Sequence, residues 1–509
     1  MLMNPPMSTP VTNRMRVLIR ADASEAIGHG HIMRCLTLAA ALAKAGAECR
    51  FICRELPGHA QALISRYGFA VDLIPCSELS SAEAIAEDAK LTLQSAGLWQ
   101  PHWVVVDHYE LNAEWQSALK STGCRLLALD DWPHRQHQSD LLLDQNLAAD
   151  AEAYSAWTDS TCRILTGARF SLLRPEFMRK KVSRIYSENN QLTILINLGG
   201  ADSPGYSADI VEQLMPLAQR LNLQLVVLVN QRSVSYTQIA EKITTGYYPF
   251  AVQLQSYCQD MCSLYDSVDL AIGAGGSSTW ERASRGLPTA LVVIADNQQA
   301  TAQAAVSAGM AVNIGDFTCS AKLYLSALAD VLKNPQQLQH MSQCAAALFD
   351  GCGPERIVRE MLLKSRQDLQ LTAAKPQDCT LFYQWQKEPG ARRFFRNPQV
   401  PVWSDHRSWY LKVLRSRTVI LYKIMLCGMA AGYIRLDIHN RRNAEISVLV
   451  TCRFQGLGLA ANALNLCASV HSERRLYAAI KNGNYASRRS FRRAGFRPSG
   501  NEMYVRHQH

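Results

Sequence analysis

A short stretch near the amino terminus combines a turn suited to phosphate with a histidine suited to proton transfer. Gly28 and Gly30 flank His29, and His31 follows directly. Glycines let the backbone approach a ligand, and the free amides at a helix start attract phosphate. The positive end of the helix dipole disfavours imidazolium and would keep His31 neutral, as a general base must be. By itself the pattern fits a catalytic base, although a histidine at a helix start more often caps or packs.

A second glycine-rich segment follows the apolar residues 270–272. Its small and hydroxyl residues could hold a diphosphate at a helix start, and they are Gly276, Ser277, Ser278 and Thr279. Glu281 lies about one helical turn further on and could accept hydrogen bonds from both hydroxyls of a ribose. The alternative is a plain glycine-rich loop with Glu281 on a solvated helix face.

A third turn of this kind lies in the carboxyl-terminal part of the chain. Residues 446–450 predict a strand, and the sequence RFQGLG at residues 453–458 leads from it into an apolar helix. A pyrophosphate would fit on the amides of such a turn. In isolation the glycines also fit a tight connection between strand and helix.

Alternating strands and helices are expected to position the first two turns. Apolar runs at residues 16–20, 49–53, 103–107 and 126–129 are separated by helical stretches. A second series comprises residues 192–198, 224–229, 270–272 and 289–294. Such alternation favours parallel sheets, in which ligands bind beyond the carboxyl ends of the strands. The sequence therefore predicts an α/β protein with two successive Rossmann-like domains.

The carboxyl-terminal part has a different pattern. The α/β pattern closes near residues 348–353, and residues 365–376 are interpreted as a polar linker. A helical start then precedes strands at residues 419–423, 429–436 and 446–450. We therefore expect an α+β domain after the linker, with domain boundaries at residues 15–180, 185–360 and 373–509.

The longer string around His31 resembles a known family. The pattern RxDASxxxGxGHxxRCLxLA at residues 20–39 is similar to the opening of the UDP-2,4-diacetamido-2,4,6-trideoxy-β-L-altropyranose hydrolases of pseudaminic acid biosynthesis. The resemblance continues through residues 105–109, 129–131, 168–177 and 197–202. It implies that His31 is catalytic, and the substrate-binding residues predicted in these segments are Arg20, Asp22, Gly28, Gly30, Asp107, Tyr109, Gly199 and Gly200. For Asp22, Asp107 and Tyr109 a role in ordering the loops is an equal alternative.

The second glycine-rich segment resembles the UDP-binding segment of glycosyltransferases with two Rossmann domains, such as the lipid II enzyme of peptidoglycan synthesis. The shared pattern is GGxSxxExxxxGxP at residues 275–288. Gln298 lies in a polar stretch that closes over the nucleotide in that family. Trp280 stands where the family often has Asn, which removes the side-chain contacts of that Asn but leaves the backbone contacts.

The third turn and residues 478–496 together resemble the GNAT N-acetyltransferases. This resemblance implies acetyl-CoA as cosubstrate, and the residues expected to bind it are Val450, Arg453, Gln455, Gly456, Leu457, Gly458, Leu459, Ala460, Asn484 and Ser487. Many members use a tyrosine near the position of Phe491 to protonate the thiolate, so Tyr485, Tyr504 or water would replace it. Glu445 and His406 are candidate bases, although an exposed edge glutamate and a packed histidine are the more common readings.

These features predict a bifunctional enzyme. Water activated by His31 attacks C1 of a UDP-activated diacetamido deoxysugar with inversion, and no metal cluster is expected. The fused domain would acetylate the 4-amino group in the preceding step. The alternatives are a UDP-sugar-dependent glycosyltransferase and an inactive nucleotide-sugar-binding scaffold.

Composition limits the setting in which this chemistry occurs. The 509 residues are 48% hydrophobic and 19% charged, which fits packed domains. No export signal is apparent, the apolar runs are too short to cross a bilayer, and the 15 cysteines include no C-x-x-C pair, so we expect a cytoplasmic protein with reduced thiols. From Ala373 onward 23 basic residues face 7 acidic ones. A phosphorylated cofactor accounts for this excess without nucleic acid, because no nucleic-acid motif accompanies it.

Overall fold

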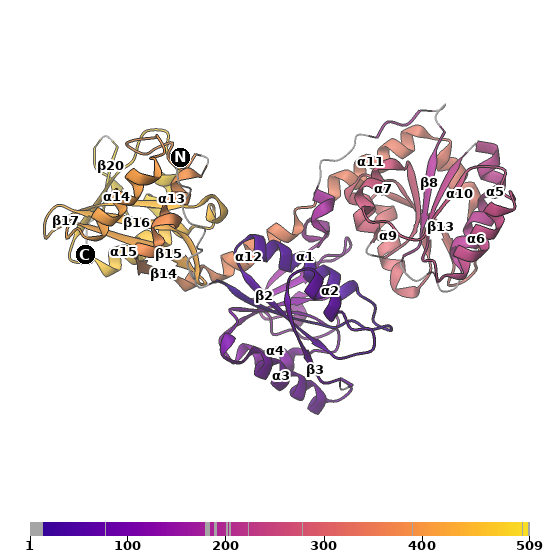
Figure 1. Cartoon of the computed structure of the whole chain (residues 1–509), viewed down its shortest axis with the longest axis horizontal. Coiled ribbons are helices and arrows are strands. Elements are labelled where there is room, and N and C mark those ends of the chain that lie inside the picture. Colours follow the sequence, from indigo (N-terminus) through magenta and orange to yellow (C-terminus); the bar gives the residue numbers. More distant parts are fainter. Residues whose placement is uncertain are drawn as a thin grey trace.

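The computed structural model of the chain contains three β-sheets, which follow one another along the sequence (Figure 1). The described residues are 14–76, 78–178, 184–187, 191–199, 202, 205–221, 223–276, 278–388, 390–500 and 502–506.

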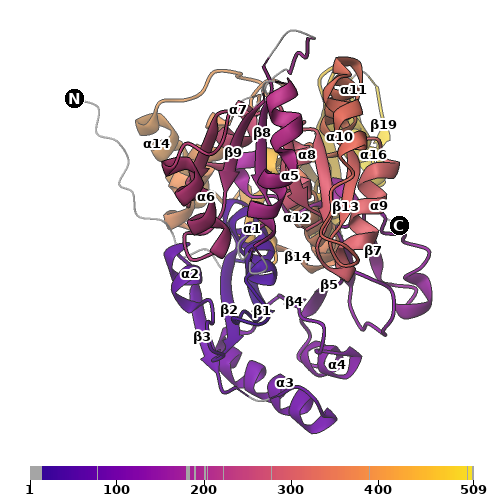
Figure 2. The same cartoon turned by 90° about the vertical axis from the view of Figure 1, so that its right-hand side faces the viewer.

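Seven parallel strands form the first sheet, in the order β3-β2-β1-β4-β5-β6-β7. They are β1 (Arg16–Ala21), β2 (Glu48–Arg54), β3 (Ala70–Ile74), β4 (Trp103–Asp107), β5 (Arg125–Leu129), β6 (Leu141–Asp144) and β7 (Arg163–Thr166). Its helices are α1 (Gly30–Lys44), α2 (Gln61–Arg66), α3 (Ala82–Ala96) and α4 (Ala113–Lys120). Side chains alternate along β1, so that Val17 and Ile19 pack toward α1 while Leu18 packs toward α3 and α4. Both views show α3 and α4 on the side of the sheet away from α1 (Figure 1 and Figure 2).

Six parallel strands form the second sheet, in the order β10-β9-β8-β11-β12-β13. They are β8 (Thr193–Asn197), β9 (Gln224–Leu228), β10 (Val252–Gln255), β11 (Leu270–Ala274), β12 (Thr289–Val293) and β13 (Ala311–Asp316). Its helices are α5 (Tyr206–Leu221), α6 (Val234–Thr244), α7 (Met261–Ser267), α8 (Ser278–Ser284), α9 (Gln299–Ser307), α10 (Leu325–Leu332) and α11 (Pro335–Leu348). The strand order reverses between β8 and β11, as it does between β1 and β4 in the first sheet. Both sheets therefore have the Rossmann topology expected from the sequence.

The chain returns to the first unit after α11. Helix α12 (Gly353–Lys364) packs on α1 and on a short 3-10 helix at Ala168–Phe170 (Figure 1). Its first residue, Gly353, lies against that segment, because a Cβ there would be 2.1 Å from the carbonyl oxygen of Ser171. The prediction that the α/β pattern closes near residues 348–353 was therefore wrong, since one further helix follows and packs on the first unit.

The third sheet is mixed, in the order β14-β15-β16-β17-β18-β20-β19. Its strands are β14 (Leu369–Ala373), β15 (Val419–Leu426), β16 (Met429–Ile438), β17 (Asn443–Val450), β18 (Arg475–Ala479), β19 (Arg497–Pro498) and β20 (Met503–Arg506), and its helices are α13 (Cys379–Lys387), α14 (Trp403–Leu414), α15 (Leu459–Val470) and α16 (Tyr485–Arg493). The expected linker at residues 365–376 was wrong, because it contains β14, whose backbone pairs with β15.

The first and third units share one apolar core. A single cluster of buried side chains runs from Val17 and Ile19 through Met361 of α12 to Ile434 and Leu464 of the third unit. Polar contacts cross the same boundary. Trp103 Nε1 donates to Ser365 Oγ at 2.9 Å, and Arg125 forms an ion pair with Asp368. The third unit is therefore packed against the first one rather than tethered to it.

Candidate functional sites

His31 lies in the first turn of α1 and beside the carboxyl end of β4. Its Nδ1 atom is 2.6 Å from Oδ1 of Asp107, the last residue of that strand. Asp107 is fully buried, whereas the His31 side chain keeps 15% of its surface exposed. An Nδ1–H donated to this carboxylate fixes the tautomer and leaves Nε2 as the ring nitrogen that can accept a proton. The geometry is that of a histidine oriented as a general base.

Arg34, one turn further along α1, holds the same carboxylate. Its Nε and Nη2 donate to the two oxygens of Asp107 at 2.5 and 2.6 Å, and its Nη1 donates to Asp131 at 2.9 Å. Burial by itself would raise the pKa of Asp107, but Arg34 and the hydrogen bond from His31 hold this pKa well below its usual range. Asp107 therefore stays ionised at every working pH. Arg34 and Asp131 were not predicted as site residues, although the i, i+3 spacing of His31 and Arg34 on a helix was a usable signal.

Tyr109 completes this group. Its hydroxyl donates to Asp131, and its ring lies edge-on to the ring of His31 with 4.9 Å between centroids. Burial and the carboxylate of Asp131 raise the pKa of Tyr109. Its hydroxyl therefore remains protonated near neutral pH, and 39% of the residue is exposed. The predicted residues His31, Asp107 and Tyr109 thus come together in one cluster.

Arg20 and Asp22 lie inside the protein rather than on an open surface. Arg20 is fully buried and pairs with Asp22 and Asp88, both at 2.6 Å. Asp22 also pairs with Arg54 at 2.6 Å and with His108 at 3.1 Å. Buried charges need such partners, and these partners occupy both side chains. These contacts favour a role for Arg20 and Asp22 in supporting the loop that precedes α1, and substrate contact by either residue stays a prediction.

Gly28 and Gly30 shape that loop. Gly28 has a φ of +76°, in the left-handed region, and its amide donates to Ser24 O at 2.8 Å. This hydrogen bond closes a turn that delivers the chain to α1. A Cβ added at either glycine would meet nothing within 4 Å, so both border open space. The predicted close approach of a ligand is sterically possible here.

The second glycine-rich loop follows β11 at the point where the strand order reverses. Thr279 is buried and its hydroxyl donates to Ala274 O at 3.2 Å, while Ser278 Oγ accepts from Arg282 at 3.2 Å. Gln298 Oε1 accepts from the amides of Gly275 and Ile294, which ties this loop to the end of β12. Of the remaining predicted residues in this half, Gly199 follows β8 and Gly276 follows β11. Gly200 and Ser277 lie outside the described residues.

Glu281 faces a partner from the segment that joins the two Rossmann units. Arg174 Nε lies 3.1 Å from Glu281 Oε1. Burial raises the pKa of Glu281, although Arg174 works in the opposite direction. The adjacent Trp280 is buried and stacks on Phe349 with 5.3 Å between ring centroids. Trp280 therefore belongs to the core, and a tryptophan at this position of the glycosyltransferase pattern contributes to packing. The backbone of the loop is unaffected by it.

The third turn lies between β17 and α15. Gly456 and Gly458 have φ values of +75° and +80°, and a Cβ at Gly458 would meet nothing within 4 Å. No side chain caps the amino end of α15, so its first amides remain available. Strand β17 pairs with β18 only over Asn443, Ala444 and Glu445, and the following residues of β17 pair with β16 alone. A turn with free amides beside a half-open strand fits the pyrophosphate and the peptide-like arm of acetyl-CoA.

The other predicted residues around this turn differ in accessibility. Leu457 and Leu459 are buried, and Gln455 Nε2 donates to Val450 O at 3.2 Å. Asn484 Oδ1 accepts from the amide of Ser487 at 3.2 Å and thereby caps α16. These side chains shape the turn and the neighbouring helix. Arg453 and Ala460 complete the predicted set, as the start of the turn and the second residue of α15.

The candidates for proton transfer in the third unit separate by exposure. Tyr485 is 77% exposed, whereas Tyr504 and Phe491 are buried. Glu445 pairs with Arg396 at 2.6 Å and keeps 19% of its side chain exposed. His406 is buried, which lowers its pKa, and its Nε2 contacts Cys379 O at 3.1 Å. The structure therefore makes His406 a packed residue and corrects its status as a candidate base.

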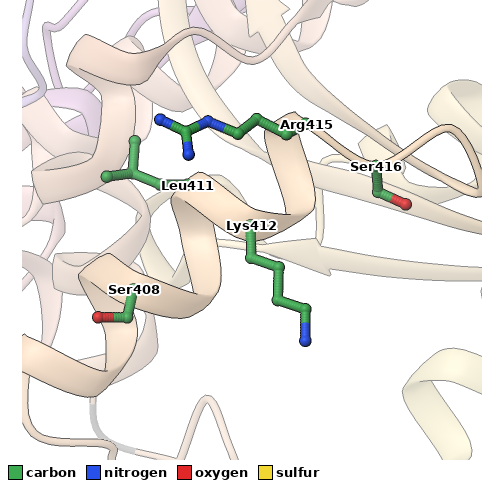
Figure 3. A pocket seen from close by; sticks show the side chains of 5 residues that line it. All are labelled: Ser408, Leu411, Lys412, Arg415 and Ser416. Atoms are coloured by element: carbon green, nitrogen blue, oxygen red, sulfur yellow. The ribbon is translucent and has the colours of Figure 1, made fainter.

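Other surfaces of the described residues add little to these sites. A hollow beside α14 is lined by residues outside every predicted site, namely Ser408, Leu411, Lys412, Arg415 and Ser416 (Figure 3). Within the described ranges, no group of three or more His, Cys, Asp or Glu side chains is placed to hold a metal ion. Among the same residues, no helix combines the length and apolar character needed to cross a membrane.

The fold defines a class of protein, namely two successive Rossmann-like units joined to an acetyltransferase (GNAT) unit. Residues 194–351 match the glycosyltransferase family 28 C-terminal domain, and residues 368–497 match the acetyltransferase (GNAT) domain. The second and third units are thus similar to enzyme domains, and we conclude that the chain is an enzyme. The predicted α/β fold and the predicted acetyltransferase resemblance are confirmed.

A particular relative matches part of the chain. Over 201 residues the chain is 30% identical to the UDP-2,4-diacetamido-2,4,6-trideoxy-β-L-altropyranose hydrolase of Campylobacter jejuni, which confirms the predicted similarity. This match covers 39% of the chain and 66% of the relative, slightly less than two thirds of its length. An uncharacterized protein of Methanocaldococcus jannaschii is 20% identical over 451 residues, which cover 86% of each chain. The crystal structure of Acinetobacter baumannii MurG, 17% identical, covers 68% of this chain and 98% of its own with a TM-score of 0.49.

Proposed function

We propose that the first two units hydrolyse a UDP-activated diacetamido deoxysugar, or a close isomer, to UDP and the free sugar. We further propose that the third unit acetylates the 4-amino group of the precursor sugar with acetyl-CoA. The observation that carries the hydrolase proposal is the His31–Asp107 pair at 2.6 Å, and the similarity of the chain to the Campylobacter hydrolase supports it.

Hydrolysis begins with a water molecule next to His31. Asp107 holds the Nδ1–H of His31, so that Nε2 takes a proton from the water as the water oxygen attacks C1 of the sugar. The bond between C1 and the diphosphate oxygen breaks, and UDP departs with the bonding electrons. One displacement from the face opposite UDP inverts the configuration at C1. The hydroxyl of Tyr109 lies beside His31, and because its proton is donated to Asp131, its oxygen is positioned to accept a hydrogen bond from the sugar.

UDP is assigned to the second Rossmann unit. The loop amides after β11 and the start of α8 offer donors to the diphosphate, and negative charge developing on the leaving group is stabilised there. The Glu281 carboxylate accepts from the ribose hydroxyls, while Arg174 holds its Oε1 atom in place. Gln298 fixes the loop through its bonds to Gly275 and Ile294 rather than through the nucleotide.

Acetyl-CoA is assigned to the turn before α15. It supplies the acetyl group as a thioester, and the amides of Gly456, Leu457 and Gly458 are the groups that would hold its pyrophosphate. Glu445 is the remaining candidate base for the sugar amine. Tyr485 is the candidate proton donor to the thiolate, because Phe491 has no hydroxyl and Tyr504 is buried.

The two reactions form a sequence, since acetylation of the 4-amino sugar yields the diacetamido sugar that the hydrolase consumes. We assign the protein to the cytoplasm, where both UDP-sugars and acetyl-CoA are made. All 15 cysteines are free thiols, which agrees with a reducing compartment.

Mass spectrometry of the products from a UDP-4-amino-4,6-dideoxy sugar, with and without acetyl-CoA, tests both activities and their order. Free acetylated sugar and UDP are expected only when acetyl-CoA is present. Replacing His31 by Asn should reduce UDP release about a hundredfold or more while acetylation persists. Turnover of the His31→Asn variant near the normal rate would remove His31 from the chemistry.

A glycosyltransferase is the second candidate function, favoured by the match of residues 194–351 to glycosyltransferase family 28. The two candidates differ in their need for an acceptor. Incubation with the UDP-diacetamido sugar alone should release UDP and sugar if the enzyme is a hydrolase. Release only after addition of an acceptor would favour transfer, and tight binding without turnover in either assay would favour an inactive scaffold.

A further inference from the structure

The turn assigned to acetyl-CoA is held by a residue outside the acetyltransferase unit. Arg359 of α12 donates through Nη2 to Gly456 O at 3.2 Å and through Nη1 to Gln455 O at 3.4 Å. The approach is close enough that a Cβ on Gly456 would be 2.9 Å from Nη2. Since α12 packs on α1, this guanidinium belongs to the body of the hydrolase.

A second contact joins the same turn to α1. Arg453 donates through Nη1 to Ala45 O at 2.8 Å, and Ala45 is the carboxyl-terminal cap of α1. Carbonyls at this end of a helix lack partners within the helix and carry partial negative charge, so they favour an arginine. The helix that begins at the His31 turn therefore ends against the acetyl-CoA turn.

The Arg359 contacts decide which way the peptide groups of the turn point. In a trans peptide the C=O and N–H bonds point in opposite directions. With the carbonyls of Gln455 and Gly456 directed at Arg359, the amides of Gly456 and Leu457 point away from it. Within the described residues neither amide has an acceptor. Both donors are thus directed to the side where a pyrophosphate would meet them.

We propose that Arg359 is a positioning residue of the acetyltransferase, which orients the pyrophosphate-binding amides from the hydrolase side of the boundary. This inference rests on the proposed binding of acetyl-CoA at residues 453–460. The acetyltransferase site is then complete only in the fused chain. Without Arg359 the turn loses the contacts that fix its conformation. CoA must then order the turn as it binds, which lowers its affinity.

Calorimetric titration of the full-length protein with CoA tests this role. Arg359→Ala is expected to raise the Kd for CoA about threefold to tenfold, the effect of losing a charge-assisted hydrogen bond. The KM for acetyl-CoA should rise by the same factor, with little change in kcat or in UDP release by the hydrolase. Arg366→Ala, which removes an exposed arginine directly after the same helix, is the matched control and should leave the Kd unchanged.

Arg359→Lys separates positioning from simple attraction of phosphate. Lysine keeps the charge but cannot reach two carbonyls with a planar fork, so its Kd should stay close to that of the alanine variant. An unchanged Kd in Arg359→Ala, or full recovery in Arg359→Lys, would overturn the positioning role. If the unaltered chain binds no CoA, the proposed acetyltransferase function fails as well, a result distinct from a loss confined to the Arg359 variants.

Discussion

His31 owes its proposed role to two neighbours with different tasks. Asp107 fixes the tautomer of its ring, and Arg34 keeps Asp107 ionised by holding both carboxylate oxygens. Arg20 and Asp22 orient no such reactive group, because their charges neutralise each other within the core. Charged residues that are close in the sequence can therefore form either a reactive group or a structural group. Burial in the folded protein decides which of the two they form.

Replacing Asp107 by Asn should exchange the carboxylate that fixes the tautomer of His31 for a neutral amide, which can donate as well as accept. We expect kcat for UDP release to fall about a hundredfold to ten-thousandfold, because the ring can adopt the wrong tautomer. The measurement is initial-rate kinetics on the UDP-sugar. Acetylation and the Kd for UDP serve as internal controls and should change little. A loss of less than about threefold in kcat would show that Asp107 does not orient the base.

Glu281 should make UDP binding dependent on pH. Because burial raises its pKa, Glu281 takes up a proton at a higher pH than an ordinary glutamate, and UDP affinity should fall as the pH drops through this raised pKa. Above that pKa the carboxylate is ionised and affinity is full. Titrations of UDP between about pH 8 and 5 measure the effect, with Glu281→Gln as control, since the phosphates of UDP titrate alike in both proteins. Equal pH profiles for the two proteins would exclude Glu281 from ribose binding.

Short elements set the geometry of all three turns. In each case a strand ends, a glycine or small residue turns the chain, and a helix begins. Gly458 shows the requirement most plainly, since its φ of +80° lies in the left-handed region and it is the cap of α15. The turn depends on this conformation rather than on any side chain at residue 458.

Gly458→Ala should weaken CoA binding through the backbone alone. The strain of a left-handed alanine costs about 1 to 2 kcal/mol, and relief of that strain would reorient the amides. Gly123→Ala is the matched control, because Gly123 has a φ of +86°, borders open space and lies in the first unit. Both variants should lose similar thermal stability by circular dichroism. Only Gly458→Ala should raise the Kd for CoA, and parallel effects on binding would contradict the assignment of this turn.

The described residues form two packed bodies rather than three, although the first body also contains a smaller apolar cluster in its Rossmann unit and another in its acetyltransferase unit. The first Rossmann unit, α12 and the acetyltransferase unit share one apolar cluster, whereas the second Rossmann unit has clusters of its own. We therefore expect calorimetry to record separate unfolding transitions for these two bodies. UDP should raise the temperature of one transition and CoA that of the other.

Single cavities in the two cores should identify the transitions. Met361 of α12 and Leu214 of α5 are both fully buried, in the shared core and in the second Rossmann core respectively. Met361→Ala and Leu214→Ala should each cost about 2 to 5 kcal/mol, by loss of burial and creation of a cavity. Each variant should lower one transition temperature only. A shift of both transitions by either substitution would mean that the chain unfolds as one body.

The sequence by itself determined the central strands of both Rossmann sheets and the three glycine turns, because these depend on residues a few positions apart. It did not predict the outer strands β3, β6, β7, β10 and β13. It placed His31 at a helix start and predicted both Rossmann units and the acetyltransferase sheet. It missed β14 and the return of α12, since a short strand and a helix in a polar stretch are recognisable only by what they pack on. In the sequence Trp280 is a departure from a motif, and its packing role follows only from its stacking on Phe349.

Only the tertiary structure decided which polar groups form hydrogen bonds with each other. Asp107 lies 76 residues from His31, and Gly456 lies 97 residues from Arg359, so no local pattern could pair them. The first contact arises because β4 pairs with β1, and the second arises because α12 packs against the acetyltransferase unit. Long-range pairs of this kind depend on how whole elements pack, and that packing turns separate motifs into sites.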